Sequence, residues 1–153
     1  MSDRSGVIAR NIVAVFCGLG GAALVVTIGT FVVFRSSFSA EDLARIRETT
    51  PGSTDFERAM TRISDPFDRV TRVTRTSTLV VFPAAALAMG LIVGGIASTR
   101  AGTLAALSTL LSSGALLIAG DLSFRSLILT TAYATLAGLS GRQMTQWQRS
   151  RGA

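Results

Sequence analysis

Apolar residues fill four long blocks of this chain, and none of these blocks contains a charged residue. The charge-free blocks are residues 11–34, 76–99, 101–120 and 126–141. A helix rises about 1.5 Å per residue and the hydrocarbon core of a bilayer is roughly 30 Å thick, so about 20 residues cross it. The first three blocks are therefore long enough to span a membrane. The fourth is shorter, and we expect its helix to begin near Leu122 and to include Arg125.

This pattern predicts an all-α integral membrane protein with a single membrane domain over residues 1–153. The expected spans are about 9–34, 78–98, 102–119 and 122–141, and residues 35–77 are expected to form an amphipathic helical loop outside the membrane. Soluble helices are a poor alternative, because four helices that are apolar all round leave almost no polar face to cover such a core. A cleaved signal peptide is disfavoured, since the first apolar block is far longer than the roughly 7–15 residues typical of one.

Composition agrees with this assignment and narrows the chemistry. Apolar residues make up 48% of the 153 residues and charged residues 16%, whereas soluble domains carry about 25% charge. The chain has no His, and all 15 basic residues are Arg, which excludes a histidine base or metal ligand and a lysine Schiff base. A lone cysteine, Cys17, cannot form an internal disulfide or a cysteine metal site. We therefore expect no catalytic residues, no cofactor and no metal.

Small residues recur at four-residue spacing in three of the four predicted spans. They are Ala14, Gly18 and Ala22, with Gly21 and Gly29 on a second stripe, in the first span; Ala86, Gly90 and Gly94 in the second; and Ala134 and Gly138 in the fourth. Small residues at this spacing allow two helix backbones to approach closely inside a membrane. We expect these ten positions to form helix–helix contacts, either within the chain or between copies.

The glycines of the first span also match a dinucleotide-binding pattern, G-x-G-x-x-A, over residues 18–23. That motif needs a strand before it, a turn at the glycines and a helix after it. Here the apolar block continues unbroken to Phe34, and a phosphate-binding turn would leave unpaired backbone in lipid. Helix packing is therefore the preferred interpretation of these glycines.

Polar groups in the last two spans admit two interpretations. Hydroxyl residues such as Thr109, Ser112 and Thr131 either make hydrogen bonds to helix backbones or line a polar path for a small ligand. Asp121 and Arg125 are spaced for an ion pair at the membrane surface. That pair is expected to anchor the fourth span at the interface, and a gating charge is the alternative.

The loop over residues 35–75 carries eight Arg and seven acidic residues. Ser39 is placed to cap a helix at residues 40–48, and a second short helix and a third segment follow. The arginines expected to contact lipid phosphates or an acidic partner are Arg58, Arg62, Arg69, Arg72 and Arg75. The alternative is a solvated loop whose charges pair with one another. The balance of charges argues against binding to nucleic acid.

Four crossings place both termini on one side of the membrane. The positive-inside rule, applied helix by helix, favours cytoplasmic termini in a bacterial inner membrane, although the raw arginine count favours the opposite side. The lack of catalytic groups and the many small-residue faces lead us to expect a non-enzymatic accessory or assembly subunit of a membrane complex. Its expected partners are the lipid bilayer and other membrane subunits or copies of itself. The alternative is a homo-oligomeric channel, holin-like pore or small transporter lined by the hydroxyls of the third and fourth spans.

Overall fold

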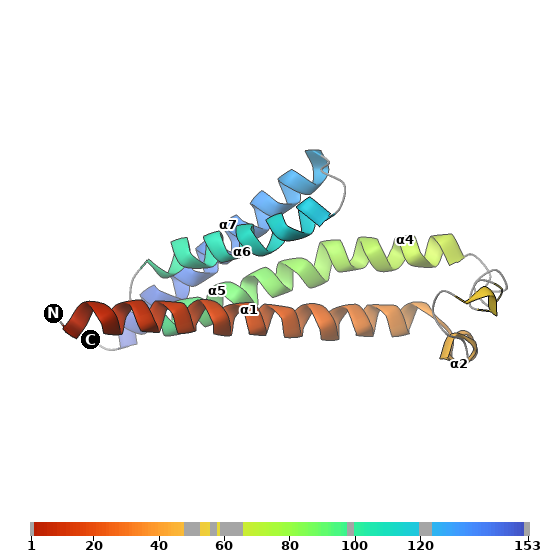
Figure 1. Ribbon diagram of the computed structural model, residues 1–153, viewed down its shortest axis with the longest axis horizontal. Helices are drawn as coiled ribbons and strands as arrows, with labels where there is room; N and C mark the ends of the chain where they lie inside the picture. Colours follow the sequence, from red (N-terminus) through yellow and green to blue (C-terminus); the bar gives the residue numbers. More distant parts are fainter. Residues whose placement is uncertain are drawn as a thin grey trace. The chain divides into compact units, whose positions relative to one another are not determined.

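Helices account for nearly all of the backbone in a computed structural model of the chain, which describes residues 2–47, 53–55, 58, 66–97, 100–119 and 124–151. The elements are α1 (Ser2–Ser37), α2 (Ala40–Arg47), α4 (Pro66–Thr76), the π-helix η1 (Ser77–Val81), α5 (Phe82–Ile96), α6 (Ala101–Ala119) and α7 (Phe124–Arg151) (Figure 1). The described residues contain no strand, which confirms the all-α prediction. The chain divides into two compact units, Met1–Val26 with Phe82–Ala153, and Thr27–Val81.

Within the described residues, two helical stretches are long and apolar enough to cross a membrane. They are Arg4–Ser37 and Phe67–Ile96. The third and fourth predicted spans form α6 and α7, but the crossing of a membrane by these two helices stays a prediction, as does the four-span topology. α7 also continues past the predicted end at residue 141 to Arg151.

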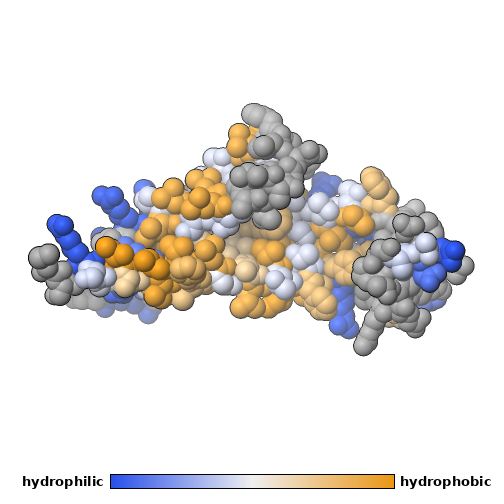
Figure 2. Space-filling model, in the orientation of Figure 1, coloured by the Kyte–Doolittle hydropathy of each residue, from blue (hydrophilic) through white to orange (hydrophobic). Residues whose placement is uncertain are grey.

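α1 leaves most of its apolar surface uncovered. Only 11% of its most apolar window is buried, and Phe16, Leu24 and Phe31 are each at least 60% exposed. Figure 2 shows apolar side chains over the middle of α1, which is drawn in the same orientation in Figure 1. A charge-free helix of this length has no polar stripe to turn toward water, so it exposes apolar residues whichever face packs.

In the first unit, α1, α5, α6 and α7 pack around a core of small side chains. Ala14, Val93, Ala105 and Ala137 are completely buried. α1 runs antiparallel to α5, because Gly18 lies against Met89 and Val93 while Arg10 reaches Ile96 near the end of α5. α5 and α7 are parallel, and α6 is antiparallel to α7. Side chains this small keep the helix axes close together, as expected for helices that pack without large apolar knobs.

The connection from α5 to α6 turns through a left-handed residue. Arg100 has a φ of 50°, and its carbonyl accepts a hydrogen bond from the Leu104 amide at 3.0 Å as α6 begins. This conformation costs a residue with a Cβ roughly 1–2 kcal/mol. Arg100 therefore holds backbone strain directly before α6.

Pro83 is the second residue of α5, two positions after the π-helix ends at Val81. Proline has no amide proton, and its ring crowds the carbonyl four residues earlier. Wider π turns are one way in which a continuous helical segment accommodates such a disturbance. Pro83 thus lies inside continuous helical backbone, and its ring explains the π-helix η1 that precedes it.

The second unit contains the short helix expected after Ser39. The Ser39 hydroxyl accepts a hydrogen bond from the Asp42 amide at 3.1 Å, while the Asp42 carboxylate accepts one from the Ser39 amide at 3.2 Å. This reciprocal pattern satisfies amides that a helix start leaves without partners. The predicted helix at residues 40–48 is confirmed as α2 (Ala40–Arg47). Most of the second predicted loop helix lies outside the described residues.

Candidate functional site

A close helix contact lies between α5 and α7 and is made by glycines. A Cβ added at Gly90 would overlap the Ser140 hydroxyl and the Ala137 carbonyl of α7. At Gly94 the added Cβ would stand 2.6 Å from the Gly141 carbonyl oxygen and 2.9 Å from Met144 Cβ. Neither position has room for a side chain, so the two backbones touch. Ala86 and Ala134, the other predicted small positions on these helices, are both 4% exposed.

α6 joins this contact through the same part of α7. Gly138 faces Ala106 and the Gly102 carbonyl, each 3.3 Å from the position of an added Cβ. Gly141 meets both neighbours, since its Cβ position is 3.3 Å from Gly102 Cα and 3.3 Å from the Gly90 carbonyl. Sequence reasoning missed Gly102 and Gly141. The four-residue spacing of Gly102 and Ala106 is the feature of the sequence that could have identified this interface.

The small residues of α1 divide between the two units. In the first unit, Gly18 lies against Val93 and Met89 of α5, and Gly21 lies against Ile92. Ala14 is fully buried in the same core, and Ala22 packs against its edge. Gly29 belongs to the second unit, where its Cβ position is 2.7 Å from Val81 Cγ1. Each of these small residues therefore lies on a packed side of α1 within its own unit.

Side chains from two other helices cap the end of α5. The hydrogen bonds run from Arg10 Nε to the Ile96 carbonyl (2.6 Å), from Gln148 Nε2 to the Gly95 carbonyl (3.1 Å) and from Thr145 Oγ1 to the Gly94 carbonyl (3.4 Å). The last four carbonyls of a helix have no partner within the helix, and they carry partial negative charge. The guanidinium of α1 and the polar side chains of α7 satisfy these groups, which ties three helix ends together.

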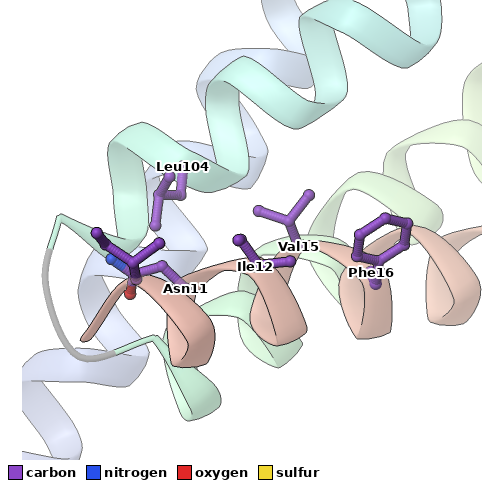
Figure 3. A pocket seen from close by; sticks show the side chains of 6 residues that line it. Asn11, Ile12, Val15, Phe16 and Leu104 are labelled. Atoms are coloured by element: carbon purple, nitrogen blue, oxygen red, sulfur yellow. The ribbon is translucent and has the colours of Figure 1, made fainter. Parts of the chain in front are cut away.

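A shallow apolar groove of about 310 Å³ lies between α1 and α6 on the outer surface of the first unit. Figure 3 shows Asn11, Ile12, Val15 and Phe16 along α1, with Leu104 of α6 across from them. Asn11 is the polar residue among the six that line it. The groove has no group suited to catalysis, and its walls match an acyl chain or an apolar helix.

Further along the outer face of α1, Gly20 points into open space. A Cβ built there meets nothing within 4 Å, unlike those at Gly18 and Gly21. Its neighbours one turn away on the same face, Phe16 and Leu24, are 70% and 60% exposed. Gly20 is therefore a notch between two large exposed apolar side chains.

Three of the hydroxyls that the sequence singled out on α6 and α7 donate to carbonyls of their own helices. Thr109 and Ser112 donate to the carbonyls of Ala105 and Ser108 at 2.9 and 2.7 Å. Thr131 donates in the same way to Leu127 at 2.9 Å. Bonds to the carbonyl four residues earlier remove the need for a polar partner. This arrangement favours the backbone-bonding interpretation over a hydroxyl-lined path.

Arg69 and Asp42 form an ion pair in the second unit. Arg69 Nη1 donates to Asp42 Oδ2 at 2.6 Å, and its guanidinium lies 5.9 Å from the centre of the Phe38 ring. Hydrogen bonds from the Ser39 hydroxyl and then from Arg69 hold the pKa of the Asp42 carboxyl below its ordinary value. Arg69 is therefore already engaged within the protein. Arg58 pairs with Asp55 at 3.1 Å, and both side chains are largely exposed.

Three of the predicted charged positions give less information. Arg62 and Asp121 lie outside the described residues, and Arg125 lies in the first turn of α7. The proposed pair of Asp121 and Arg125 therefore stays a prediction. Arg72 and Arg75 lie on α4 and are exposed.

Comparisons with known proteins found no match, because no family model, curated protein or solved structure matches this chain. Within the described ranges, no group of three or more His, Cys, Asp or Glu side chains is placed to hold a metal ion.

Proposed function

We propose that this protein is a non-enzymatic integral membrane protein that crosses the bilayer four times and serves as an accessory or assembly subunit of a membrane complex. The outer face of α1 is its contact surface for another subunit. The observation that carries the proposal is the Gly20 notch between Phe16 and Leu24.

Membrane embedding is supported by the exposure of α1. Its large apolar side chains face outward along the whole charge-free block, including Ile12, Phe16 and Ile28, each more than half exposed. Burying a side chain of this size is worth about 1.5–3 kcal/mol, so leaving a long row of them in water would be very costly. A bilayer covers such a row without any further protein.

A protein partner is supported by the choice of glycine at position 20. Glycine in a helix interior costs about 1 kcal/mol relative to alanine, and no contact with the described residues requires it there. Lipid tails also do not require it, because they adapt to any side chain. A second helix that packs closely against α1 would require a small residue at this place.

Four crossings are supported by the arrangement of helix ends in the first unit. Arg10 near the start of α1 and Gln148 near the end of α7 both bond to the last turn of α5. The start of α6 lies there as well, since Gly102 contacts Arg142. We place this end, which also carries Arg100, at the cytoplasmic face of a bacterial inner membrane, because the positive-inside rule assigns it there for most helices.

Cysteine labelling tests the topology. A Cys17→Ser background carries either Asp3→Cys or Met60→Cys and is treated with a membrane-impermeant reagent in intact cells. We expect labelling at position 60 and none at position 3. Labelling at 3 but not at 60 contradicts cytoplasmic termini, and labelling at both contradicts the topology altogether.

Affinity capture in mild detergent followed by native mass spectrometry tests the function. We expect unlike subunits in fixed ratio, and we expect Gly20→Leu to release them. The matched control is Gly6→Leu, because Gly6 also meets nothing within 4 Å but stands before the charge-free block. A closed ring of identical chains supports the alternative channel or pore. Unchanged capture by the Gly20 variant refutes the role of α1.

A further inference from the structure

The two charge-free blocks that reach the second unit are each bounded there by an arginine. Residues 11–34 are followed by Arg35 in the last turn of α1, and residues 76–99 are preceded by Arg75 in the last turn of α4. A charge next to a long apolar block marks the level at which hydrocarbon gives way to headgroups and water. Both boundaries therefore fall in the same compact unit.

The two boundaries also stand at one level along the paired helices. Two contacts fix the register of the pair, namely Gly29 with Val81 and Phe38 with the guanidinium of Arg69. The segments are antiparallel, and both Arg35 and Arg75 fall between these contacts. Each lies six residues from the first contact, which is about 9 Å along α1 and somewhat less along the chain that passes through η1. The end of one apolar block is thus level with the end of the other.

The arginines of this unit differ in whether they already have an acidic partner. Arg69 bonds to Asp42 at 2.6 Å with its side chain only 25% exposed, and Arg58 bonds to Asp55 at 3.1 Å. Three other arginines are exposed and form no ion pair within the described part of the chain: Arg35, Arg72 and Arg75. The structure thereby divides a group of arginines that looks uniform in the sequence.

We infer that Arg35, Arg72 and Arg75 form a binding surface for the headgroups of anionic phospholipids at one face of the membrane. This inference rests on the proposed membrane embedding and narrows the arginines that contact lipid. Arginine binds phosphate oxygens with paired N–H donors, and it prefers anionic over zwitterionic surfaces. Within α4 itself Asp68 is the one acid, and it stands one turn before Arg72, so Arg72 and Arg75 are not balanced by acids of their own helix.

Apolar side chains beside these arginines identify a lipid as the occupant, in preference to an acidic protein. Phe31 and Val32 stand about one turn before Arg35, and they are 60% and 57% exposed. Leu79 and Val80 follow Arg75 by four and five residues, and they are 59% and 60% exposed. A ligand that covers this surface must be apolar on one side of the arginine level and anionic at that level. A phospholipid with a negative headgroup has this combination.

Lipid selectivity in nanodiscs tests the inference. The full-length protein is reconstituted with equal amounts of phosphatidylcholine and phosphatidylglycerol, and native mass spectrometry measures which lipid stays bound. We expect the wild type to retain phosphatidylglycerol preferentially. Each arginine removed should lower this preference about fivefold, both in the double variant Arg35→Gln/Arg75→Gln and in the single variant Arg72→Gln.

Arg58→Gln is the matched control, because it removes one positive charge from the same unit at a position that already has an acid partner. It should leave the preference unchanged. Equal retention of phosphatidylglycerol by the wild type and the double variant overturns the inference, and so does an equal loss in the control. In either case a protein that still inserts into the nanodiscs leaves the proposed membrane function standing, whereas a protein that fails to insert overturns both.

Discussion

The glycine contact between α5 and α7 predicts how much stability the protein loses when a methyl group is added there, and Gly20 provides the reference position. We compare Gly94→Ala with Gly20→Ala, because both changes add one methyl group to a long apolar helix. Each gains about 1 kcal/mol in helix propensity. At Gly20 the new methyl meets nothing within 4 Å, whereas at Gly94 it comes within 2.6 Å of the Gly141 carbonyl oxygen. The difference between the two variants therefore isolates the cost of packing.

The magnitude follows from that distance. Ordinary van der Waals contact begins at 3.4 Å, so the α5 and α7 backbones must separate by 0.8 Å to admit the methyl group. The obstacle is backbone, which cannot rotate away as a side chain would. Overpacking of this kind costs about 1–3 kcal/mol, and we expect Gly94→Ala to be less stable than Gly20→Ala by that amount.

Unfolding in mixed micelles provides the assay. Each variant is titrated with a denaturing detergent while circular dichroism follows loss of helix, and the midpoints and slopes give the free energies of unfolding. Gly20→Ala should unfold slightly later than the wild type, and Gly94→Ala clearly earlier than Gly20→Ala. Equal midpoints for the two variants would refute the close α5–α7 contact.

Three further predictions concern polar residues. Arg10→Gln should lower stability by about 1 kcal/mol in the same titration, because the Ile96 carbonyl loses a charged donor at 2.6 Å; an unchanged midpoint contradicts the cap. The Ser39 hydroxyl and Arg69 lower the pKa of the Asp42 carboxyl below its ordinary value of about 4. The stability that this carboxylate adds to the folded protein is therefore complete above the ordinary pKa, and it is lost as the pH falls through the lower pKa of the folded state. Asp42→Asn should therefore flatten the decline of melting temperature between neutral and acidic pH, and a decline as steep as in the wild type counts against the pairing. Arg100→Gly should raise stability by about 1 kcal/mol, because glycine adopts a φ of 50° without strain, and a decrease contradicts the left-handed turn.

The helical class of the fold was readable from the sequence because the apolar blocks are long and lack charge. The element ends were less so. α7 continues past residue 141 to Arg151, where Thr145 and Gln148 bond to the end of α5. That extension depends on a neighbouring helix about fifty residues away, and no local pattern in the chain encodes it.

The candidate site was predictable to a similar degree. Spacing identified Gly90, Gly94 and Gly138, but it could not tell which of the glycines lie at a crossing of three helices, as Gly141 does. Glycines also occur on the outward side of α1, and only the packing shows that Gly18 and Gly21 contact α5 while Gly20 does not.

The arginines show why charge pattern alone was insufficient. Arg69 and Arg72 are three residues apart on α4, yet Arg69 is engaged by Asp42, a residue 27 positions earlier in the chain. That pair joins α2 to α4, and the sequence pattern does not specify that these two helices lie together. The distinction between engaged and available arginines therefore required the structure.

Removal of amphiphile tests the central claim that lipid surrounds this protein. The purified protein is exchanged from detergent into plain buffer and analysed by size-exclusion chromatography with light scattering. The exposed apolar surface of α1 predicts aggregation, reversed when detergent or lipid is present during the exchange. A folded, monodisperse species in buffer without any amphiphile would contradict the claim and, with it, the proposed function.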